Sequence, residues 1–398
     1  MNIESGDIMK TIKDMNIKNK KVLIRCDFNV PIKDGKIVDD SRIQASLETI
    51  NYALKEDAKV ILFSHLGRIK EESDLSKNSL AIVSDRLAKL LKHDVLFVEK
   101  TRGEQLEDAI NSMEDKDVIL VQNTRYEDLA GKKESGNDKE LGAYWASLGD
   151  VFINDAFGTC HRAHASNVGI SSHLPSAVGF LVEKELKALD TLKWVKSPFI
   201  IILGGSKVED KIGVINTLAA KADYILIGGG MAFTFLKAEG YEVGNSLIDS
   251  DNIEFAKEML NKYAKKIILP IDVITSLEIK DDVKTKTCAI NEIEYNEMGL
   301  DIGPNTIKLF QKYLECATMV LWNGPLGVYE YKNFAKGTKE VMTYLVDNNI
   351  KTILGGGDIV AASAKFNLKD KVFHASTGGG ATLEYIEKGT LPALEVIE

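Results

Sequence analysis

The chain has 398 residues, 44% of them hydrophobic and 27% charged, which is typical of a globular protein long enough for two cores. Its 50 basic and 59 acidic residues give a net charge of −9, so we expect no nucleic-acid partner and only a local basic patch for any phosphate. The N-terminus lacks the apolar run of a signal peptide, and no later stretch approaches the ~20 apolar residues that span a bilayer. The lack of such a stretch also leads us to expect no membrane partner. Four cysteines without C-x-x-C spacing favour reduced thiols, and therefore a cytoplasmic protein.

Short apolar runs alternate with helical stretches in two series along the chain. The first series comprises 22–24, 60–63, 95–98, 118–121 and 151–153, and the second comprises 199–203, 224–227, 267–269, 319–322 and 352–354. Continuous apolar runs are typical of strands buried on both faces, and helices between them indicate parallel connections. The predicted fold class is therefore α/β, with two doubly wound parallel-sheet (Rossmann-like) domains.

The stretch 183–196 separates the two series and places apolar residues on one helical face. We predict that it is a connecting helix between a first domain, residues 1–182, and a second domain, residues 197–382. The region 277–295 has no helical period, so we predict an exposed β excursion without an assigned function.

All seven arginines of the chain precede residue 163, and four of them follow predicted strands closely. Ligands of doubly wound sheets bind beyond the carboxyl ends of the strands. We expect a basic cup there for a small, highly anionic substrate, formed by Arg42, Arg68, Arg125, Arg162, His65 and His161. The alternative is that these arginines form ordinary surface ion pairs. Asp27 and Asn29 would orient a substrate hydroxyl or, alternatively, only form the turn before Pro31.

The second half places glycine-rich turns after its strands, where main-chain N–H groups and helix N-termini bind anions. Gly204 and Gly205 precede a predicted helix whose first turns carry Lys207 and Lys211, and two further glycine runs cover 355–357 and 378–380. Three such turns indicate a polyphosphate. Asp358 follows the second run, either as a Mg²⁺ ligand or as a helix N-cap. The chain contains neither G-x-x-x-x-G-K-[ST] nor G-x-G-x-x-G, so the nucleotide is held by another arrangement.

Eight segments together resemble one known family, phosphoglycerate kinase, over residues 25–384. They are RCDFNVP, SHLGR, GTCHRAH, LGGSKVEDKI, IGGGMAFTF, LWNGPLGVYE, GGGD and STGGGATLE, in this order. The resemblance implies a 3-phosphoglycerate site at Asp27, Asn29, Arg42, His65, Arg68, Arg125 and Arg162. It implies a nucleotide site at Gly204, Gly205, Lys207, Lys211, Gly228, Gly229, Gly230, Asn323, Glu330, Gly357, Asp358 and Ile359. The phosphate and Mg²⁺ apparatus would use Lys207, Lys211, Asp358 as metal ligand, and Gly378 to Gly380. The C-terminal tail, 383–398, would return to the first domain.

The implied reaction is reversible phosphoryl transfer from 1,3-bisphosphoglycerate to ADP, which yields 3-phosphoglycerate and ATP in glycolysis and gluconeogenesis. The acceptor in the reverse direction is a carboxyl group, so no general base is needed. Catalysis would then rest on closure of two lobes and on charge stabilisation, with Lys207, Arg42, Gly379 and Gly380 as the catalytic groups. We expect Mg²⁺ as cofactor and a monomer. Residues Ile69, Cys160, Ser206 and Ile359 depart from the family's usual choices, and none of these changes removes a charged group.

Two other functions remain compatible with the residues alone. A nicotinamide dehydrogenase shares the α/β architecture, although the dinucleotide fingerprint is missing. A hinged two-lobe binding protein would lack catalysis, and Lys207 together with Asp358 argues against it.

Overall fold

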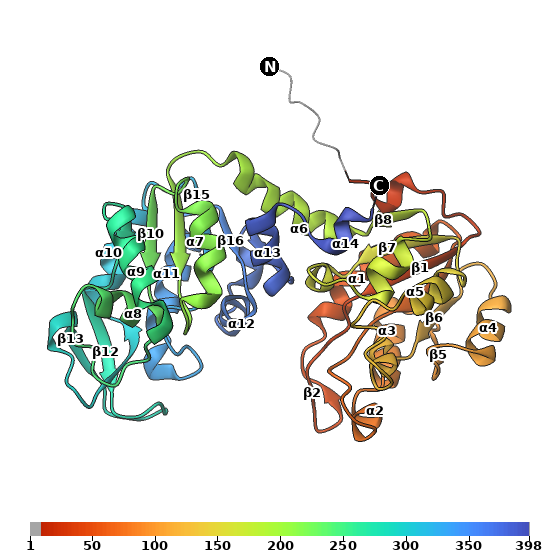
Figure 1. Cartoon of the computed structure of the whole chain (residues 1–398), viewed down its shortest axis with the longest axis horizontal. Coiled ribbons are helices and arrows are strands. Elements are labelled where there is room, and N and C mark those ends of the chain that lie inside the picture. Colours follow the sequence, from red (N-terminus) through yellow and green to blue (C-terminus); the bar gives the residue numbers. More distant parts are fainter. Residues whose placement is uncertain (1–8, 398) are drawn as a thin grey trace, which may run out of the picture. The chain divides into compact units, whose positions relative to one another are not determined.

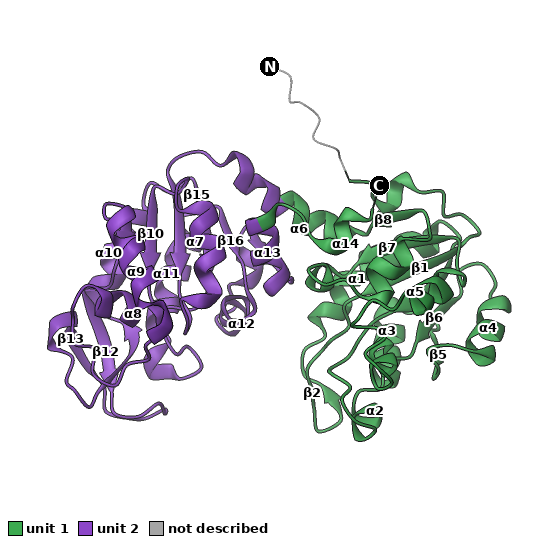
Figure 2. Cartoon of the chain, viewed as in Figure 1, with its two compact units in different colours: residues 1–187, 388–398 green, residues 188–387 purple. Residues whose placement is uncertain are grey.

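The computed structural model describes residues 9–397. Residues 1–8 of the N-terminus and Glu398 at the end of the predicted tail lie outside the described part. The chain forms two compact units (Figure 2). Unit 1 contains residues up to Lys187 together with Lys388 onward, and unit 2 contains Ala188–Glu387.

Unit 1 is built on a six-stranded sheet with the order β5-β6-β4-β1-β7-β8, in which every pairing is parallel (Figure 1). Its strands are β1 (Lys21–Cys26), β4 (Lys59–Phe63), β5 (Leu96–Val98), β6 (Val118–Val121), β7 (Val151–Asp155) and β8 (Ser176–Val178). Alternate residues of β1 belong to different cores, since Val22 and Ile24 pack in one and Leu23 in the other. Both faces of the sheet are therefore covered, which explains the continuous apolar runs.

Helices and short turns cover this sheet and connect its strands. They are η1 (Ile12–Asp14), α1 (Ser41–Lys55), α2 (Ser73–Lys77), α3 (Ala81–Leu91), α4 (Glu104–Asn111), η2 (Thr124–Asp128), α5 (Lys139–Ala146), η3 (Phe157–Thr159), the π-helical turn η4 (Ala165–Gly169) and α14 (Pro392–Glu395). A small antiparallel hairpin pairs β2 (Ile32–Lys33) with β3 (Lys36–Ile37). In the C-terminal segment, Ala393 N donates to Cys160 O at 3.1 Å, within unit 1.

Unit 2 has a second six-stranded parallel sheet, with the order β11-β10-β9-β15-β16-β17. Its strands are β9 (Phe199–Leu203), β10 (Tyr224–Ile227), β11 (Ile267–Ile268), β15 (Met319–Asn323), β16 (Thr352–Leu354) and β17 (His374–Ala375). Its longer helices are α7 (Ile212–Leu218), α8 (Met231–Ala238), α9 (Ile253–Lys262), α10 (Pro304–Leu314), α11 (Lys336–Asp347), α12 (Gly357–Lys365) and α13 (Gly380–Lys388). The predicted fold class is confirmed.

Some elements differ from the prediction in detail. The helix predicted over 183–196 begins earlier, as α6 (Phe180–Asp190), and ends in a 3-10 turn, η5 (Thr191–Trp194). The region 277–295 contributes one strand, β13 (Lys286–Ala289), and the 3-10 turn η8 (Ile290–Glu292). Strand β13 joins β12 (Asp272–Ser276) and β14 (Met298–Ile302) in a three-stranded antiparallel sheet. Strands β8 and β17 were not predicted, because each has only two or three residues and no long apolar run.

Candidate functional site

The residues predicted for the anionic substrate, Asp27 included, follow four neighbouring strands of unit 1. Asp27 follows β1, His65 follows β4, Arg125 lies in η2 after β6, and Arg162 follows β7. The sheet order β6-β4-β1-β7 makes these strands adjacent, and all four are parallel. Their carboxyl ends therefore share one edge of the sheet, which is where such folds bind ligands.

Asp27 and Asn29 link the loops after β1 and β4. Asp27 Oδ2 accepts a hydrogen bond from Arg42 Nη1 at 2.5 Å, and its Oδ1 accepts from Asn29 N at 3.3 Å. Asn29 Oδ1 accepts from Gly67 N at 2.8 Å. Arg42 keeps 38% of its side chain exposed. Asp27 thus does more than form a turn, because it orients an arginine that still faces solvent.

The other cationic residues of the cup differ in burial. Arg125 is buried, donates from Nη1 to Gly67 O at 3.1 Å and has a lowered pKa, chiefly because of desolvation. Arg68 and Arg162 are exposed, and Arg162 Nε donates to His161 Nε2 at 3.1 Å. Within residues 9–397, no carboxylate forms an ion pair with Arg68, Arg125 or Arg162. The ion-pair alternative therefore holds only for Arg42.

A buried polar layer supports the cup, and most of it was missed by sequence reasoning. Arg25, inside β1, donates from Nε to Ser166 Oγ at 2.8 Å and lies with Nη2 3.2 Å from His65 Nδ1. Glu134 accepts two hydrogen bonds from Ser166. Burial is the main cause that holds the pKa of His65 well below its usual value, followed by the charge of Arg25. A lone glutamate in a polar loop gives no sequence signal for such a role.

Cys160 lies directly before His161, yet it has no features of a nucleophile. Its side chain is fully buried, and burial raises the pKa of the thiol to about 12. A buried thiol of this kind is inert.

In unit 2, glycine turns follow neighbouring strands of the second sheet. Gly204 follows β9, Gly228 follows β10, Gly355 follows β16, and Gly378 lies in the turn between β17 and α13. A Cβ atom on Gly204 would come 2.2 Å from Pro325 O, and Gly205 and Gly229 have φ of 91° and 62°. These main-chain segments approach one another too closely for side chains. The N–H groups of Gly204, Gly205, Gly228 and Gly229 donate to main-chain carbonyl oxygens of neighbouring segments, which holds the turns together.

The two lysines after the first turn lie differently from the prediction. We expected both in the first turns of a helix, but Lys207 precedes the 3-10 turn η6 (Glu209–Lys211) and is exposed. Lys211 is the N-cap of α7. Burial lowers the pKa of Lys211, opposed by the charges of Asp210 and Asp358. Lys207 is therefore an exposed cation, whereas Lys211 is partly buried and feels the charges of Asp210 and Asp358.

Asp358 lies in the first turn of α12, and the N-cap of that helix is Gly356, with φ of 112°. The N-cap interpretation of Asp358 is therefore wrong. Its carboxylate is exposed, and no group of three or more His, Cys, Asp or Glu among the described residues is arranged to hold a metal ion. A cation here would need ligands from a bound phosphate.

The remaining predicted nucleotide residues lie around the same strand ends. Asn323 closes β15, donates from Nδ2 to Gly355 O, and has a buried Oδ1 without a partner among residues 9–397. Glu330 is exposed, and its carbonyl oxygen accepts from Lys365 Nζ at 2.7 Å. Ile359 is fully buried, so its side chain serves packing. Gly379 has φ of 54°, and Gly380 begins α13.

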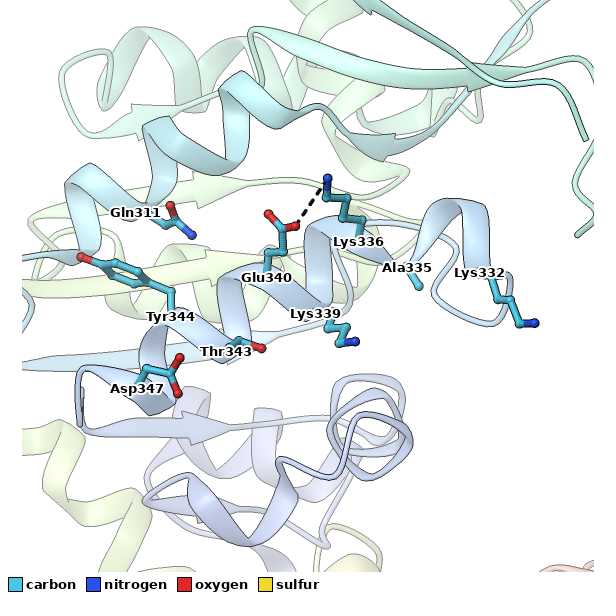
Figure 3. A pocket seen from close by; sticks show the side chains of 9 residues that line it. All are labelled: Gln311, Lys332, Ala335, Lys336, Lys339, Glu340, Thr343, Tyr344 and Asp347. Atoms are coloured by element: carbon cyan, nitrogen blue, oxygen red, sulfur yellow. Dashed lines mark ion pairs between the residues drawn. The ribbon is translucent and has the colours of Figure 1, made fainter. Parts of the chain in front are cut away.

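A separate surface groove lies on α10 and α11 (Figure 3). Its lining residues are Gln311, Lys332, Ala335, Lys336, Lys339, Glu340, Thr343, Tyr344 and Asp347. Lys336 and Glu340 form an ion pair across one turn at 3.5 Å. None of the residues predicted for either site lines this groove.

Two parallel doubly wound sheets with polar residues and glycine turns at their carboxyl ends define an α/β protein of the nucleotide-binding type. A sequence model described as phosphoglycerate kinase matches residues 12–389. The chain belongs to the phosphoglycerate kinase family.

Relatives support this assignment over nearly the whole length. The chain is 54% identical to the phosphoglycerate kinase of Enterococcus faecalis, covering 98% of each chain. It is also 54% identical to that of Fusobacterium nucleatum, covering 98% of this chain and 99% of the relative. The solved phosphoglycerate kinase of Coxiella burnetii has a TM-score of 0.87 at 37% identity, with 98% of this chain and 99% of that chain covered.

The chain is therefore an enzyme, a kinase that performs the phosphoglycerate kinase reaction in glycolysis. This excludes both the dehydrogenase and the non-catalytic binding protein. Within residues 9–397, none of the helices combines the length and the apolar character needed to cross a bilayer.

Proposed function

We propose that unit 1 binds 3-phosphoglycerate or 1,3-bisphosphoglycerate and that unit 2 binds ADP or ATP. The observation that carries this proposal is the contrast between the two sheet edges. Cationic side chains follow β4, β6 and β7 of unit 1 and are joined by Arg42 in α1, whereas glycine turns follow the strands of unit 2. The first arrangement suits a compact anion and the second suits a polyphosphate chain.

In unit 1, side chains would bind the substrate's carboxyl, hydroxyl and phosphate groups. The proposed ligands are Asp27, Asn29, Arg42, His65, Arg68, Arg125 and Arg162. The exposed Arg68 and Arg162 are free of ion pairs with described residues, and Arg42 is already oriented by Asp27. Preorganised donors reduce the ordering that binding requires.

In unit 2, the main chain would bind the nucleotide. The proposed residues are Gly204, Gly205, Lys207, Lys211, Gly228, Gly229, Gly230, Asn323, Glu330, Gly357, Asp358 and Ile359. Close packing of the glycine turns supports this role, because it leaves no room for side chains at the strand ends and lets a ligand approach the main chain. Ile359 would contribute through its N–H, since its side chain is buried.

The transfer itself needs positioning and charge rather than a base. The attacking oxygen belongs either to a carboxylate or to an ADP phosphate, and neither has a proton to lose. We propose that Lys207 and Arg42 neutralise charge on the transferring group and that the N–H groups of Gly379 and Gly380 orient it. Because the ligands bind different units, both units must close on the reacting atoms and exclude water.

The residues present fit a Mg²⁺ ion that arrives with the nucleotide. Mg²⁺ is usually held by one or two carboxylates plus phosphate oxygens and water, and Asp358 offers one exposed carboxylate beside Lys211. When bound, the ion would supply positive charge to the phosphate oxygens. Asp358 would hold it, and Lys211 would fix the neighbouring phosphate.

The Asp358→Asn variant tests this assignment. It removes the metal-binding charge and leaves the glycine turns intact, so we expect weaker productive binding of the Mg-nucleotide and partial rescue at high Mg²⁺. Activity measured as a function of Mg²⁺ concentration provides the readout. Wild-type activity with wild-type Mg²⁺ dependence would contradict a metal-binding role for Asp358.

Hydrogen exchange with each ligand alone tests the division between the units. We expect 3-phosphoglycerate to slow exchange in 64–68 and 158–164, and Mg-ADP to slow it in 203–212 and 355–359. Protection by either ligand in the other set of segments, and not in its own, would reject the proposed division.

We further propose a monomeric, cytoplasmic enzyme, consistent with four unpaired cysteines. Sedimentation at micromolar concentration would test the monomer.

A further inference from the structure

A line of buried hydrogen bonds runs beneath the basic cup from a carboxylate to the ring of His65. Glu134 Oε2 accepts from Ser166 N at 2.9 Å, and Oε1 accepts from Ser166 Oγ at 2.5 Å. Ser166 Oγ accepts from Arg25 Nε at 2.8 Å, and Arg25 Nη2 lies 3.2 Å from His65 Nδ1. Glu134, Ser166 and Arg25 are fully buried, and His65 is 6% exposed.

The direction of every bond in this line is fixed by its two ends. Burial raises the pKa of Glu134, and the charge of Arg25 and the hydrogen bonds from Ser166 oppose this shift and favour the ionised form. An ionised carboxylate only accepts hydrogen bonds, and a guanidinium only donates them. The Ser166 hydroxyl must therefore point its proton at Glu134, which leaves an oxygen lone pair for Arg25. At the other end, His65 Nδ1 must accept from Arg25, so the proton of the neutral ring is on Nε2.

We infer that Glu134 is a positioning residue for substrate binding. It orients Arg25 through Ser166, and Arg25 in turn fixes His65 as the neutral tautomer with a single donor at Nε2. His65 therefore offers the anion a fixed N–H group rather than a positive charge. This inference rests on the proposed role of His65 as a ligand of 3-phosphoglycerate.

The charges around His65 keep its ring neutral. Arg25 in β1, Arg42 in α1, Arg125 in η2 and the neighbouring His164 all lower its pKa, and burial lowers it most. Glu134 lies beneath Arg25, with Oε1 4.0 Å from Arg25 Nη2. A donor that does not titrate near neutral pH makes substrate binding at this position independent of pH.

An amide cannot replace the carboxylate at residue 134. If the amide oxygen faced the Ser166 hydroxyl, the NH₂ group would meet Ser166 N–H, donor against donor. If the amide were turned, its NH₂ group would donate to Ser166 Oγ and turn the hydroxyl proton away from Glu134's position. Either orientation leaves one buried donor unpaired and releases the constraint on Arg25.

Nitrogen NMR of histidine-labelled wild-type protein tests the inference directly, without substrate. We expect His65 to show an unprotonated Nδ1 and a protonated Nε2, with no change between pH 8 and pH 5.5. A proton on Nδ1, or a ring that becomes charged within this range, would overturn the inference. Loss of one signal in His65→Ala assigns the resonance.

Ligand binding to the Glu134→Gln variant measures how much the positioning role of Glu134 contributes to affinity for 3-phosphoglycerate. We expect the Kd of 3-phosphoglycerate to rise about tenfold, the Kd of ADP to stay within about twofold, and the His65 signals to move away from the single tautomer. Wild-type or tighter binding of 3-phosphoglycerate would overturn the positioning role, since removal of a negative charge alone strengthens anion binding. Ser166→Ala breaks the same line at its middle and should give the same pattern, which keeps the test valid if Glu134→Gln folds poorly.

Asp272→Asn is the matched control. Asp272 is a buried carboxylate in unit 2 that accepts from both the main-chain N–H and the hydroxyl of Thr306, at 2.7 Å each. Its loss should lower stability without a change in the Kd of 3-phosphoglycerate.

Titration of the His65→Ala variant with 3-phosphoglycerate separates the proposed ligand role of His65 from the positioning role of Glu134. Unchanged 3-phosphoglycerate binding there would reject the ligand role of His65, while the NMR result would still decide the tautomer.

Discussion

The proposed sites of the two units differ in the parts of the polypeptide that would bind an anion. Unit 1 would use side chains, and its cup would depend on a buried layer in which Arg25, Ser166 and Glu134 are joined by hydrogen bonds. Unit 2 would use the main chain, and its turns have no room for side chains at positions such as Gly204 and Gly229. A side-chain site is therefore sensitive to lost charge and support, whereas a main-chain site is sensitive to added volume.

Lys207 is the exception to this contrast, because it is an exposed side chain in the unit that would bind its ligand through the main chain. We expect its substitution to have the largest effect on catalysis. Its ammonium would meet charge that develops on the transferring group. We expect Lys207→Ala to lower kcat by on the order of 10²–10³-fold, with much smaller changes in the Kd of ADP and 3-phosphoglycerate. Steady-state kinetics beside direct titration of each ligand provide the measurement.

Lys221→Ala is the control for this variant, since Lys221 is also exposed but precedes β10 at the amino end of the strands. Lys211→Ala should act mainly on nucleotide binding. If Lys207→Ala kept a near-normal kcat and lost ADP binding, the roles of the two lysines would be reversed.

Gly204→Ala tests the demand of unit 2 for empty space. The new Cβ would come 2.2 Å from Pro325 O, a main-chain atom that cannot move without shifting the turn after β15. Overpacking of this kind costs about 1–3 kcal/mol, so we expect ADP binding to weaken about 10–100-fold. In Gly213→Ala the added atom meets only the flexible end of Glu387, so binding should stay normal. Equal effects of the two variants would argue against a special role for the turn.

Arg42→Ala tests the side-chain site of unit 1. Sulfate and phosphate should compete for the basic cup, and raised ionic strength should weaken this effect. Loss of Arg42 should weaken 3-phosphoglycerate binding about tenfold and reduce the response to sulfate. Arg86→Ala is the matched control for Arg42→Ala. Arg86 pairs with Asp40 at 2.5 Å, as Arg42 does with Asp27, but it is not one of the residues predicted for the cup. An unchanged sulfate response in Arg42→Ala would place the anion site elsewhere.

The sequence was informative wherever one local pattern decides the structure. Apolar runs predicted most strands of both sheets, and glycine runs and arginines after those strands predicted which residues share each edge. The supporting layer could not be predicted in this way. Glu134 and Arg25 are more than a hundred residues apart, and only the fold brings the carboxylate beneath the strand. The start of α6 was missed for a related reason, since its first turn is held by Asp155 on β7.

The contact of Asp155 with α6 should affect stability and have the smallest effect on activity. It is a further buried polar contact on which unit 1 depends. Asp155 Oδ1 accepts from Leu181 N at 2.9 Å, and desolvation is the main cause that raises the pKa of the carboxyl group to about 7. The folded state thus keeps a proton that the unfolded state releases near the ordinary aspartate pKa of 3.8. Stability from this group is present below that value and is lost as pH rises toward 7.

Asp155→Asn keeps an acceptor for Leu181 N–H and removes the titration. We expect the free energy of unfolding of the wild type, relative to the variant, to fall by on the order of 2 kcal/mol between pH 5 and pH 7. His164, whose pKa burial lowers to about 3, acts in the opposite sense, because it favours the folded state as pH rises toward 6.5. The difference between the variant and the wild type cancels this histidine contribution. Urea unfolding of both proteins at pH 5 and pH 7 measures this difference in the free energy of unfolding. If the free energies of the two proteins changed in parallel with pH, Asp155 would be ionised throughout this range.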